Sequence, residues 1–339
     1  MSGSTNMRSP SARGTRLALL VAGAASIVLS ASAVSALSAE PESTTAAKAS
    51  PAAPAPSASA AQTFDTPQQA ADAMVAAAEK FDVQALIHLV GRDGEDLVLT
   101  GEYAQDRERA KAFAAEARTK MQVSVDAKTG NRALLLVGNT NWPFALPIVK
   151  HGTRWSFDAA AGRDELFNRR IGNNELDAIE ICRGFVEAQF DYAYRKRSGY
   201  EVPAYAQKVI STPGTQDGLA WKNADGTWGG PIGEKIAEAI AQGYNVQAEP
   251  YHGYFFKVLK GQGPHAPLGA MDFVVHGVMI GGFALVAAPA EYGETGFKTF
   301  MVSHTGVVYE KDLGPGTLET FQKMEVFDPD KTWTPVEDD

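Results

Sequence analysis

The change of hydrophobic period near residue 120 constrains the fold more than any other feature of the sequence. Before it, apolar residues recur at helical spacing in "TPQQAADAMVAAAEKF", in "DVQALIHLVG" and in a third segment from Asp106 to about Lys120. After it, "MQVSVDAKTGNRALLLVG" and "FALPIVKHGTRWSFD" alternate with a period of two, around turns at residues 128–131 and at His151 and Gly152. Helices followed by an antiparallel meander predict an α+β domain over residues 64–158.

This order of elements is typical of cone-shaped domains of the cystatin-like or nuclear-transport-factor-like kind, in which a curved sheet wraps a long helix. Enzymes on such a cone place an acid and a hydrogen-bond donor inside the pocket. The side chains expected to point inward are all apolar here, so we expect a filled pocket: Val123, Val125, Leu134, Leu136, Ile148, Trp155 and Phe157. His88, between Ile87 and Leu89 in the second helix, is predicted to be structural.

The rest of the chain divides into a helical connecting region, residues 159–243, and an antiparallel β domain, residues 244–339. In the connecting region we expect two helices separated near residues 171–173, then a glycine-rich loop and a helix over about 231–242. Runs of β-branched and aromatic residues broken by glycine follow, and "HGYFFKVLKG" is predicted to be an interior strand because both of its faces are largely apolar. The predicted whole is an α+β protein with an N-terminal cone, a helical middle and a C-terminal β-meander.

The N-terminus has the pattern of an export signal. Arg8, Arg13 and Arg16 precede an apolar run of about thirteen residues and a small-residue tail, without any acidic residue. We expect cleavage after Ala39, with Ala36 as the alternative; an uncleaved anchor is the other reading, although the run is shorter than the ~20 residues that span a bilayer. Residues 40–63, rich in Ala, Pro and Ser, are predicted to be a disordered linker. The mature chain is therefore expected to be periplasmic or secreted, with no membrane span.

Charge and cysteine content exclude several classes of protein. Removal of residues 1–39 leaves 28 basic residues against 40 acidic ones, a formal charge of −12, which argues against a nucleic-acid partner. The single cysteine, Cys182, cannot form an internal disulfide, and it falls on the apolar stripe of a predicted helix, where a packed thiol is expected. Neither a metal nor a cofactor is predicted, because no H-E-x-x-H, H-x-H, G-x-S-x-G or phosphate-loop spacing occurs.

A short list of polar and aromatic residues could still carry binding. The arginine pair is either a set of helix-end charges or a bidentate grip on a carboxylate, and the tryptophans either pack on a core or form a sugar platform. The histidines after residue 250 include two in predicted turns, and a metal would require three of them, or two with Asp272, to converge. The candidate binding residues are Arg169, Arg170, Glu175, Trp221, Trp228, His252, Tyr254, Gln262 and Asp272; His265, His276 and His304 complete the histidine set.

Several strings resemble a bacterial family catalogued only as domain-of-unknown-function family 2950. They include "WPFALPIVKHGTRWSFDAAAGRDELFNRRIGNNELDAI", "STPGTQDGLAW", "YHGYFFKVLKGQGP" and "GGFALVAAPAEYGETGFKTFMV". The resemblance implies export from Gram-negative cells and carries no catalytic residues. "HAPLGAMDF" departs from the family pattern at Leu268 and Met271, where glycine and tyrosine are usual. The last strands are also similar, more faintly, to the globular heads of type IV pilin-like proteins, which implies a small antiparallel sheet.

Two functions follow as hypotheses. The first is a non-catalytic envelope protein that binds another envelope protein or a cell-wall component. The alternative is an exported hydrolase at the domain junction that uses Arg169, Glu175, His252 and Asp272. A single catalytic site requires these side chains to meet within about 10 Å, because proton transfer needs hydrogen-bond reach.

Overall fold

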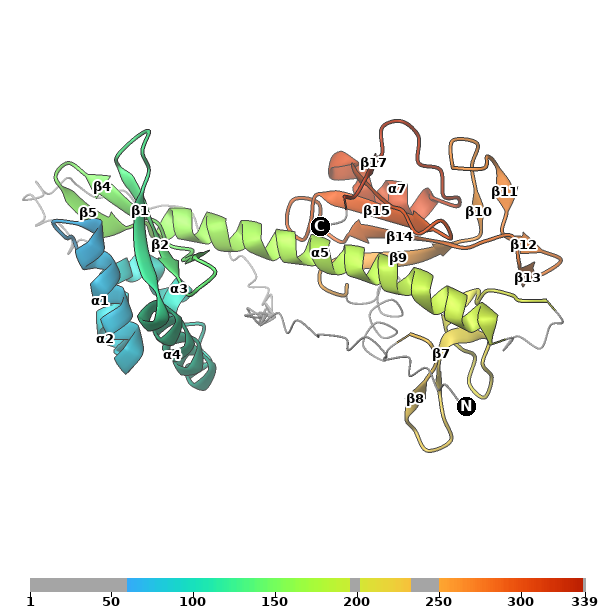
Figure 1. Ribbon diagram of the computed structural model, residues 1–339, viewed down its shortest axis with the longest axis horizontal. Helices are drawn as coiled ribbons and strands as arrows, with labels where there is room; N and C mark the ends of the chain where they lie inside the picture. The colour runs from blue at the N-terminus through green and yellow to red at the C-terminus, as the bar shows by residue number, and fades with distance from the viewer. Residues whose placement is uncertain (1–59, 196–201, 233–249, 338–339) are drawn as a thin grey trace, which may run out of the picture. The chain divides into compact units, whose positions relative to one another are not determined.

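The computed structural model describes residues 60–195, 202–232 and 250–337, and these residues form an α+β protein (Figure 1). The predicted signal peptide and most of the predicted linker lie outside the described residues. So does nearly all of the helix predicted over residues 231–242. The description below concerns the described ranges alone.

The first helices begin where their capping residues predict. α1 (Pro67–Lys80) has Pro67 in its first turn, and the Thr66 hydroxyl accepts a hydrogen bond of 3.2 Å from the Gln69 N–H. α2 (Val83–Val90) is capped by the Asp82 carboxylate and followed by η1 (Arg92–Gly94) and α3 (Glu95–Val98). α4 (Tyr103–Thr119) begins three residues before the predicted Asp106. Asp106 is instead buried in the first turn, where its carboxylate accepts hydrogen bonds from Thr100.

Both predicted hairpins of the first sheet are confirmed. The strands β1 (Met121–Val125), β2 (Arg132–Val137), β4 (Ile148–His151) and β5 (Arg154–Phe157) are antiparallel in that order, and β3 (Trp142–Pro143) pairs with β2. The predicted inward face of β2 is wrong. Its buried residues are Ala133, Leu135 and Val137, whereas Leu134 and Leu136 are half-buried on the other face. Because β2 is apolar at both parities, the sequence does not determine which face turns inward.

Three of the other residues expected to face inward, Ile148, Trp155 and Phe157, are buried in the first core, while Val123 is only partly buried and Val125 is 45% exposed. The core also takes residues from α1, α2 and α4.

A single helix, α5 (Ala159–Tyr194), follows β5 directly. The Asp158 carboxylate caps it by accepting a hydrogen bond of 3.0 Å from the Ala161 N–H. The break predicted near residues 171–173 is wrong, because one glycine inside a helix costs only about 1 kcal/mol and the apolar stripe continues beyond Gly172 through Ala178, Ile179 and Cys182.

The segment after α5, predicted as helix and loop, contains a small sheet. β6 (Lys208–Ile210) runs parallel to β7 (Gly218–Lys222), and β8 (Trp228–Gly229) pairs with β7 in antiparallel fashion. The middle region is therefore helical only in part.

The C-terminal sheet is antiparallel, as predicted, with the order β17-β16-β15-β14-β9. Its strands are β9 (Tyr254–Leu259), β14 (Ala284–Pro289), β15 (Lys298–Ser303), β16 (Val308–Asp312) and β17 (Thr334–Pro335). Two ribbons, β10 (Gly261–Gln262) with β11 (Met271–Asp272) and β12 (Val274–Val275) with β13 (Val278–Met279), follow β9, and η2 (Gly314–Gly316) leads into α7 (Thr317–Lys323). Both α5 and α7 contact β14, which is buried along its whole length.

β9 was expected to be an interior strand, but among the described residues it pairs only with β14. Its aromatic content is nevertheless explained by burial, since Phe255, Phe256 and Leu259 belong to the second core. Packing on the two faces, rather than pairing on both edges, accounts for the apolar pattern.

Candidate functional site

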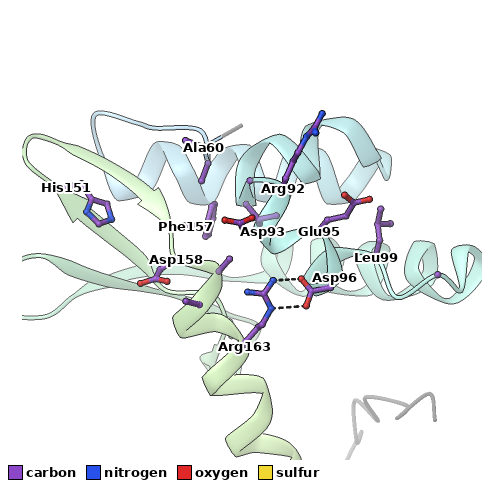
Figure 2. Close-up of a pocket in the computed structure, with 16 residues that line it drawn as sticks. Ala60, Arg92, Asp93, Glu95, Asp96, Leu99, His151, Phe157, Asp158 and Arg163 are labelled. Carbon is purple, nitrogen blue, oxygen red and sulfur yellow. Dashed lines mark hydrogen bonds and ion pairs between the residues drawn. The ribbon is translucent and has the colours of Figure 1, made fainter. Parts of the chain in front are cut away.

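A solvent-open hollow of about 1170 Å³ lies at the start of α5 (Figure 2). We call it the α5 hollow. It is formed by the end of α2, η1, α3, the β4–β5 hairpin and the first turns of α5. Its lining residues include Val90, Arg92, Asp93, Glu95, Asp96, Leu99, His151, Phe157, Asp158 and Arg163.

One ion pair fixes the wall between α3 and α5. The Arg163 guanidinium donates to both carboxylate oxygens of Asp96, at 2.9 and 2.6 Å, as the dashed lines in Figure 2 show. The hydrogen bond that Arg163 donates to Asp96 raises the pKa of Arg163 above its ordinary value. This bidentate geometry orients the two side chains and leaves both charges occupied.

Other charges in the α5 hollow are not occupied in this way. Within residues 60–195, 202–232 and 250–337, Arg92, Asp93 and Glu95 form no ion pair, and all three lie in the short η1–α3 segment. They stand beside apolar lining residues, of which Leu99 is half-buried and Phe157 is buried. The α5 hollow therefore offers both signs of charge next to apolar side chains.

None of the nine candidate binding residues from the sequence lines the α5 hollow. The signal that could have found it is the dense charge of "GRDGED" between two helices. His151, predicted as a turn residue, is the last residue of β4 and lies at this site.

A second cluster of polar contacts joins α5 to the C-terminal sheet. The Glu175 carboxylate accepts hydrogen bonds from the backbone N–H groups of Phe297, at 2.9 Å, and Lys298, at 3.1 Å. The Asn174 amide donates to the Thr295 carbonyl at 2.9 Å, and Arg170 donates to the Glu294 carbonyl at 3.4 Å. Two of the candidates, Arg170 and Glu175, thus anchor α5 to the loop before β15.

His252 belongs to the same cluster through a residue that the sequence did not single out. Its Nδ1 contacts the Asp177 carboxylate of α5, and its ring stacks on Tyr251 with a centroid distance of 4.1 Å. His252 and Gly253 have φ values of 45° and 75° in a two-residue turn between paired Tyr251 and Tyr254, so this is a type I′ hairpin turn with histidine at its first central position.

Tyr254 is fully buried, and its hydroxyl donates to the Lys298 carbonyl at 2.8 Å. Burial raises the pKa of Tyr254 far above its ordinary range, so the phenol stays protonated. Gly296 leaves the space for the ring, because a Cβ there would lie 2.2 Å from the phenol oxygen. This contact fixes the start of β9.

The structure separates Asp272 from His252 and Glu175. Asp272 lies on β11 and pairs with Gly261, beyond the far end of β9, whereas the His252 turn precedes the near end. At about 3.3 Å per residue, the strand places roughly 20 Å between them. Gln262 is also at the far end, where its buried amide donates to the carbonyls of Pro267 and Gly269 and closes that loop.

The remaining candidates make packing contacts. Arg169 donates to Glu165, one turn back on α5, and to the Pro143 carbonyl, both at 2.8 Å, and its guanidinium stacks over Trp142. Trp221 is buried, and Trp228 lies half-buried under the Lys222 ammonium. These geometries match the structural alternative for Arg169, an intrahelical pair, and for Trp228, which packs against the second core. Trp221 is buried, and its indole N–H donates to the Asn223 side chain at 3.2 Å.

The thiol and the other histidines also have structural surroundings. Burial raises the pKa of the Cys182 thiol to about 12, which suppresses the thiolate. His265 contacts Asp328 at 3.0 Å, His276 is the first central residue of the β12–β13 turn, and half-buried His304 packs edge-on against Phe273. No three His, Cys, Asp or Glu side chains of the described residues come together as a metal group would need.

The described helices include none that is long and apolar enough to cross a bilayer. The fold and the site together define an α+β protein with a mixed-charge surface hollow and a polar junction between its long helix and its C-terminal sheet. The chain belongs to the family described as "Protein of unknown function (DUF2950)", whose model matches residues 61–336. No curated protein and no solved structure matches the chain in the comparisons made, so the likeness to pilin heads stays a prediction.

Proposed function

We propose that this chain is an exported, non-catalytic binding protein of the bacterial envelope, and that the α5 hollow is its binding site. The observation that carries the proposal is the set of three charged side chains in the hollow, Arg92, Asp93 and Glu95, which have no ion-pair partner among the described residues. Charges held at a hollow without an internal partner are available to a ligand.

The lining indicates the class of ligand. Asp93 and Glu95 suit an ammonium group, Arg92 suits a carboxylate, and half-buried Leu99 suits an aliphatic portion. Peptides carry all three groups, so a cell-wall peptide or an exposed segment of another envelope protein fits this site.

The contacts of the other candidates favour binding over hydrolysis. Glu175 is occupied by two backbone N–H groups, and Asp272 lies beyond the far end of β9 from His252. The hydrolase hypothesis needs these groups at one reacting bond. The contact between the His252 ring and the Asp177 carboxylate joins groups that can act as acid and base, so the experiment below includes it.

Export is proposed from the sequence pattern of residues 1–39, and it gives the ligand its compartment. The formal charge of −12 expected for the mature chain also suits a protein that does not bind anionic lipid headgroups or nucleic acid.

The test is a binding assay with the purified mature chain, isolated cell-wall material and a periplasmic extract. We expect the double variant Asp93→Asn/Glu95→Gln to bind at least about tenfold more weakly, since each charged hydrogen bond is worth ~1.5–3 kcal/mol. The matched control is Glu180→Gln/Glu187→Gln, which removes two exposed charges from α5 away from the hollow. Undiminished binding by the first variant would refute the site.

The same samples test the alternative. Release of soluble wall fragments by the wild-type chain, lost in His252→Ala with folding intact by circular dichroism, would support a hydrolase. We expect no release from either chain.

A further inference from the structure

The two outer strands of the N-terminal sheet differ in how their free edges are covered. At the β5 edge, the Phe64 N–H donates to the Trp155 carbonyl at 2.7 Å and the Trp155 N–H donates back at 2.8 Å. Arg154 adds a hydrogen bond of 2.9 Å to the Thr63 carbonyl. At the opposite edge, β1 pairs with β2 alone in the part of the chain that the structure describes.

The hydrogen bonds to β2 show which backbone groups of β1 face the open edge. The Lys120 carbonyl accepts from the Gly138 N–H at 2.9 Å, and the Asp126 N–H donates to the Arg132 carbonyl at 2.8 Å. Even-numbered residues therefore pair with β2. Because backbone groups alternate along an antiparallel strand, the N–H and C=O groups of Met121, Val123 and Val125 point away from the sheet.

β1 lacks the features with which proteins usually block such an edge. Its sequence, "MQVSV", has no proline and no charge, Gln122 and Ser124 are exposed, and Val125 is 45% exposed. In the C-terminal sheet, the edge strand β17 is two residues long and ends in Pro335.

We propose that β1 pairs with β1 of a second copy of this chain, antiparallel and across a two-fold axis at Val123. This register places Met121 opposite the partner's Val125 and Val123 opposite the partner's Val123. The two-fold axis makes the Met121–Val125 pair twice, so with the central Val123 pair there are three. All three use the outward backbone groups, and each forms two hydrogen bonds. The two sheets then become one continuous sheet.

The flanking charges select both the occupant and the register. In the pairing centred on Val123, Lys120 lies opposite the partner's Asp126, and the two-fold axis makes this contact twice. Both residues are exposed at the ends of β1. A shift by two residues in either direction removes both charge pairs and one hydrogen-bonded pair. An isologous contact with its own charge complementarity fits a second copy better than an unrelated peptide.

A five-residue edge buries less surface than the ~1,200–2,000 Å² of a standard stable interface. The dimer is therefore a weak one, and it is to be measured by sedimentation of the mature chain at concentrations up to about 1 mM. Monomer throughout this range would overturn the proposal.

A charge exchange tests the contact itself. Lys120→Glu and Asp126→Lys each place like charges opposite one another twice, so each variant alone should self-associate about tenfold more weakly. An equimolar mixture of the two restores both opposite-charge pairs in the heterodimer, and association should recover. Lys128→Glu, in the adjoining turn, changes the same charge without facing the partner and should behave as wild type. If the wild-type chain dimerises and both single variants dimerise as strongly, the interface lies elsewhere.

Asp126 also accepts hydrogen bonds from the N–H groups of Lys128 and Thr129, and Asp126→Lys removes both from the hairpin. A cysteine experiment avoids this. Gln122 faces the partner's Ser124 as a close, non-hydrogen-bonded pair, so Gln122→Cys and Ser124→Cys chains, mixed and oxidised, should form a disulfide heterodimer. Each variant alone should cross-link far less, and buried Cys182 should not interfere. Equal cross-linking in all samples would refute the register.

Discussion

His265 and Asp328 make the stability of the loop after β10 dependent on pH. The Asp328 carboxylate accepts hydrogen bonds from the His265 backbone N–H at 2.7 Å and contacts its ring at 3.0 Å. The hydrogen bond and the negative charge raise the pKa of His265 above its ordinary 6.5. A raised pKa in the folded state stabilises the protein below pH ~6.5, and this contribution is lost as the pH rises through the folded pKa.

We therefore expect the free energy of unfolding of the wild-type chain, compared with His265→Gln, to fall between about pH 6 and pH 8. Urea unfolding at several pH values measures the difference. His304 acts in the opposite sense, since burial lowers its pKa, so the comparison with the variant is needed to isolate His265. His88→Gln, at a histidine whose ring contacts the neutral Gln62 side chain, is the matched control substitution. A pH-independent difference would show that the pair contributes nothing.

Some features of single residues can be predicted from the sequence and others cannot. Helix caps at Thr66 and Asp82 were predictable because a side-chain oxygen and the nearby N–H groups suffice. Leu268 was noted only as a departure from glycine, yet its φ of 75° and 83% exposure show a strained position where glycine is the favoured residue. Asp177 was missed because its partner, His252, is 75 residues away.

At the scale of elements, the two glycines of α5 should differ in how their replacement by alanine changes the free energy of unfolding. A Cβ at Gly172 would meet no atom within 4 Å, whereas a Cβ at Gly162 would lie 2.9 Å from the Leu146 side chain. Alanine in a helix interior is favoured over glycine by ~0.5–1 kcal/mol. Gly172→Ala should therefore raise the free energy of unfolding by about that amount in urea.

Gly162→Ala is the matched control in the same helix, and it should stabilise the protein less or destabilise it, because Leu146 must move. A loss of stability in Gly172→Ala would mean that the helix is interrupted at this glycine after all, as the sequence pattern first indicated.

Elements were predictable where one period dominated. The two hairpins of the first sheet were correct because alternation and turn residues agree. The inward face of β2 was not, because Leu134 and Leu135 are equally apolar. The strands β6, β7 and β8 were not, because they have only three, five and two residues, too few to show a period.

At the scale of the whole molecule, the described residues form two hydrophobic cores that share no residue. One takes its members from residues 64–157 and includes Leu135; the other takes them from residues 178–333 and includes Cys182 and Leu285. The sequence predicted a domain boundary at Asp158, and separate cores favour separate unfolding of the two parts. The α5 hollow was not predictable at this scale, because it is assembled from segments that no single sequence window contains.

Cys182 reports on the second core, because its thiol is buried and its pKa is raised to about 12, so a thiol reagent reaches it only when that core opens. Leu135→Ala removes a fully buried side chain of the first core and should destabilise it by ~2–5 kcal/mol. If the cores unfold independently, hydrogen exchange of β2 shifts to lower urea while the midpoint of Cys182 labelling stays in place. Leu285→Ala, the matched change in the second core, should shift the labelling instead. If each variant shifts the midpoints of β2 exchange and of Cys182 labelling equally, the two cores form one cooperative unit. The boundary at Asp158 would then not separate two independently unfolding parts.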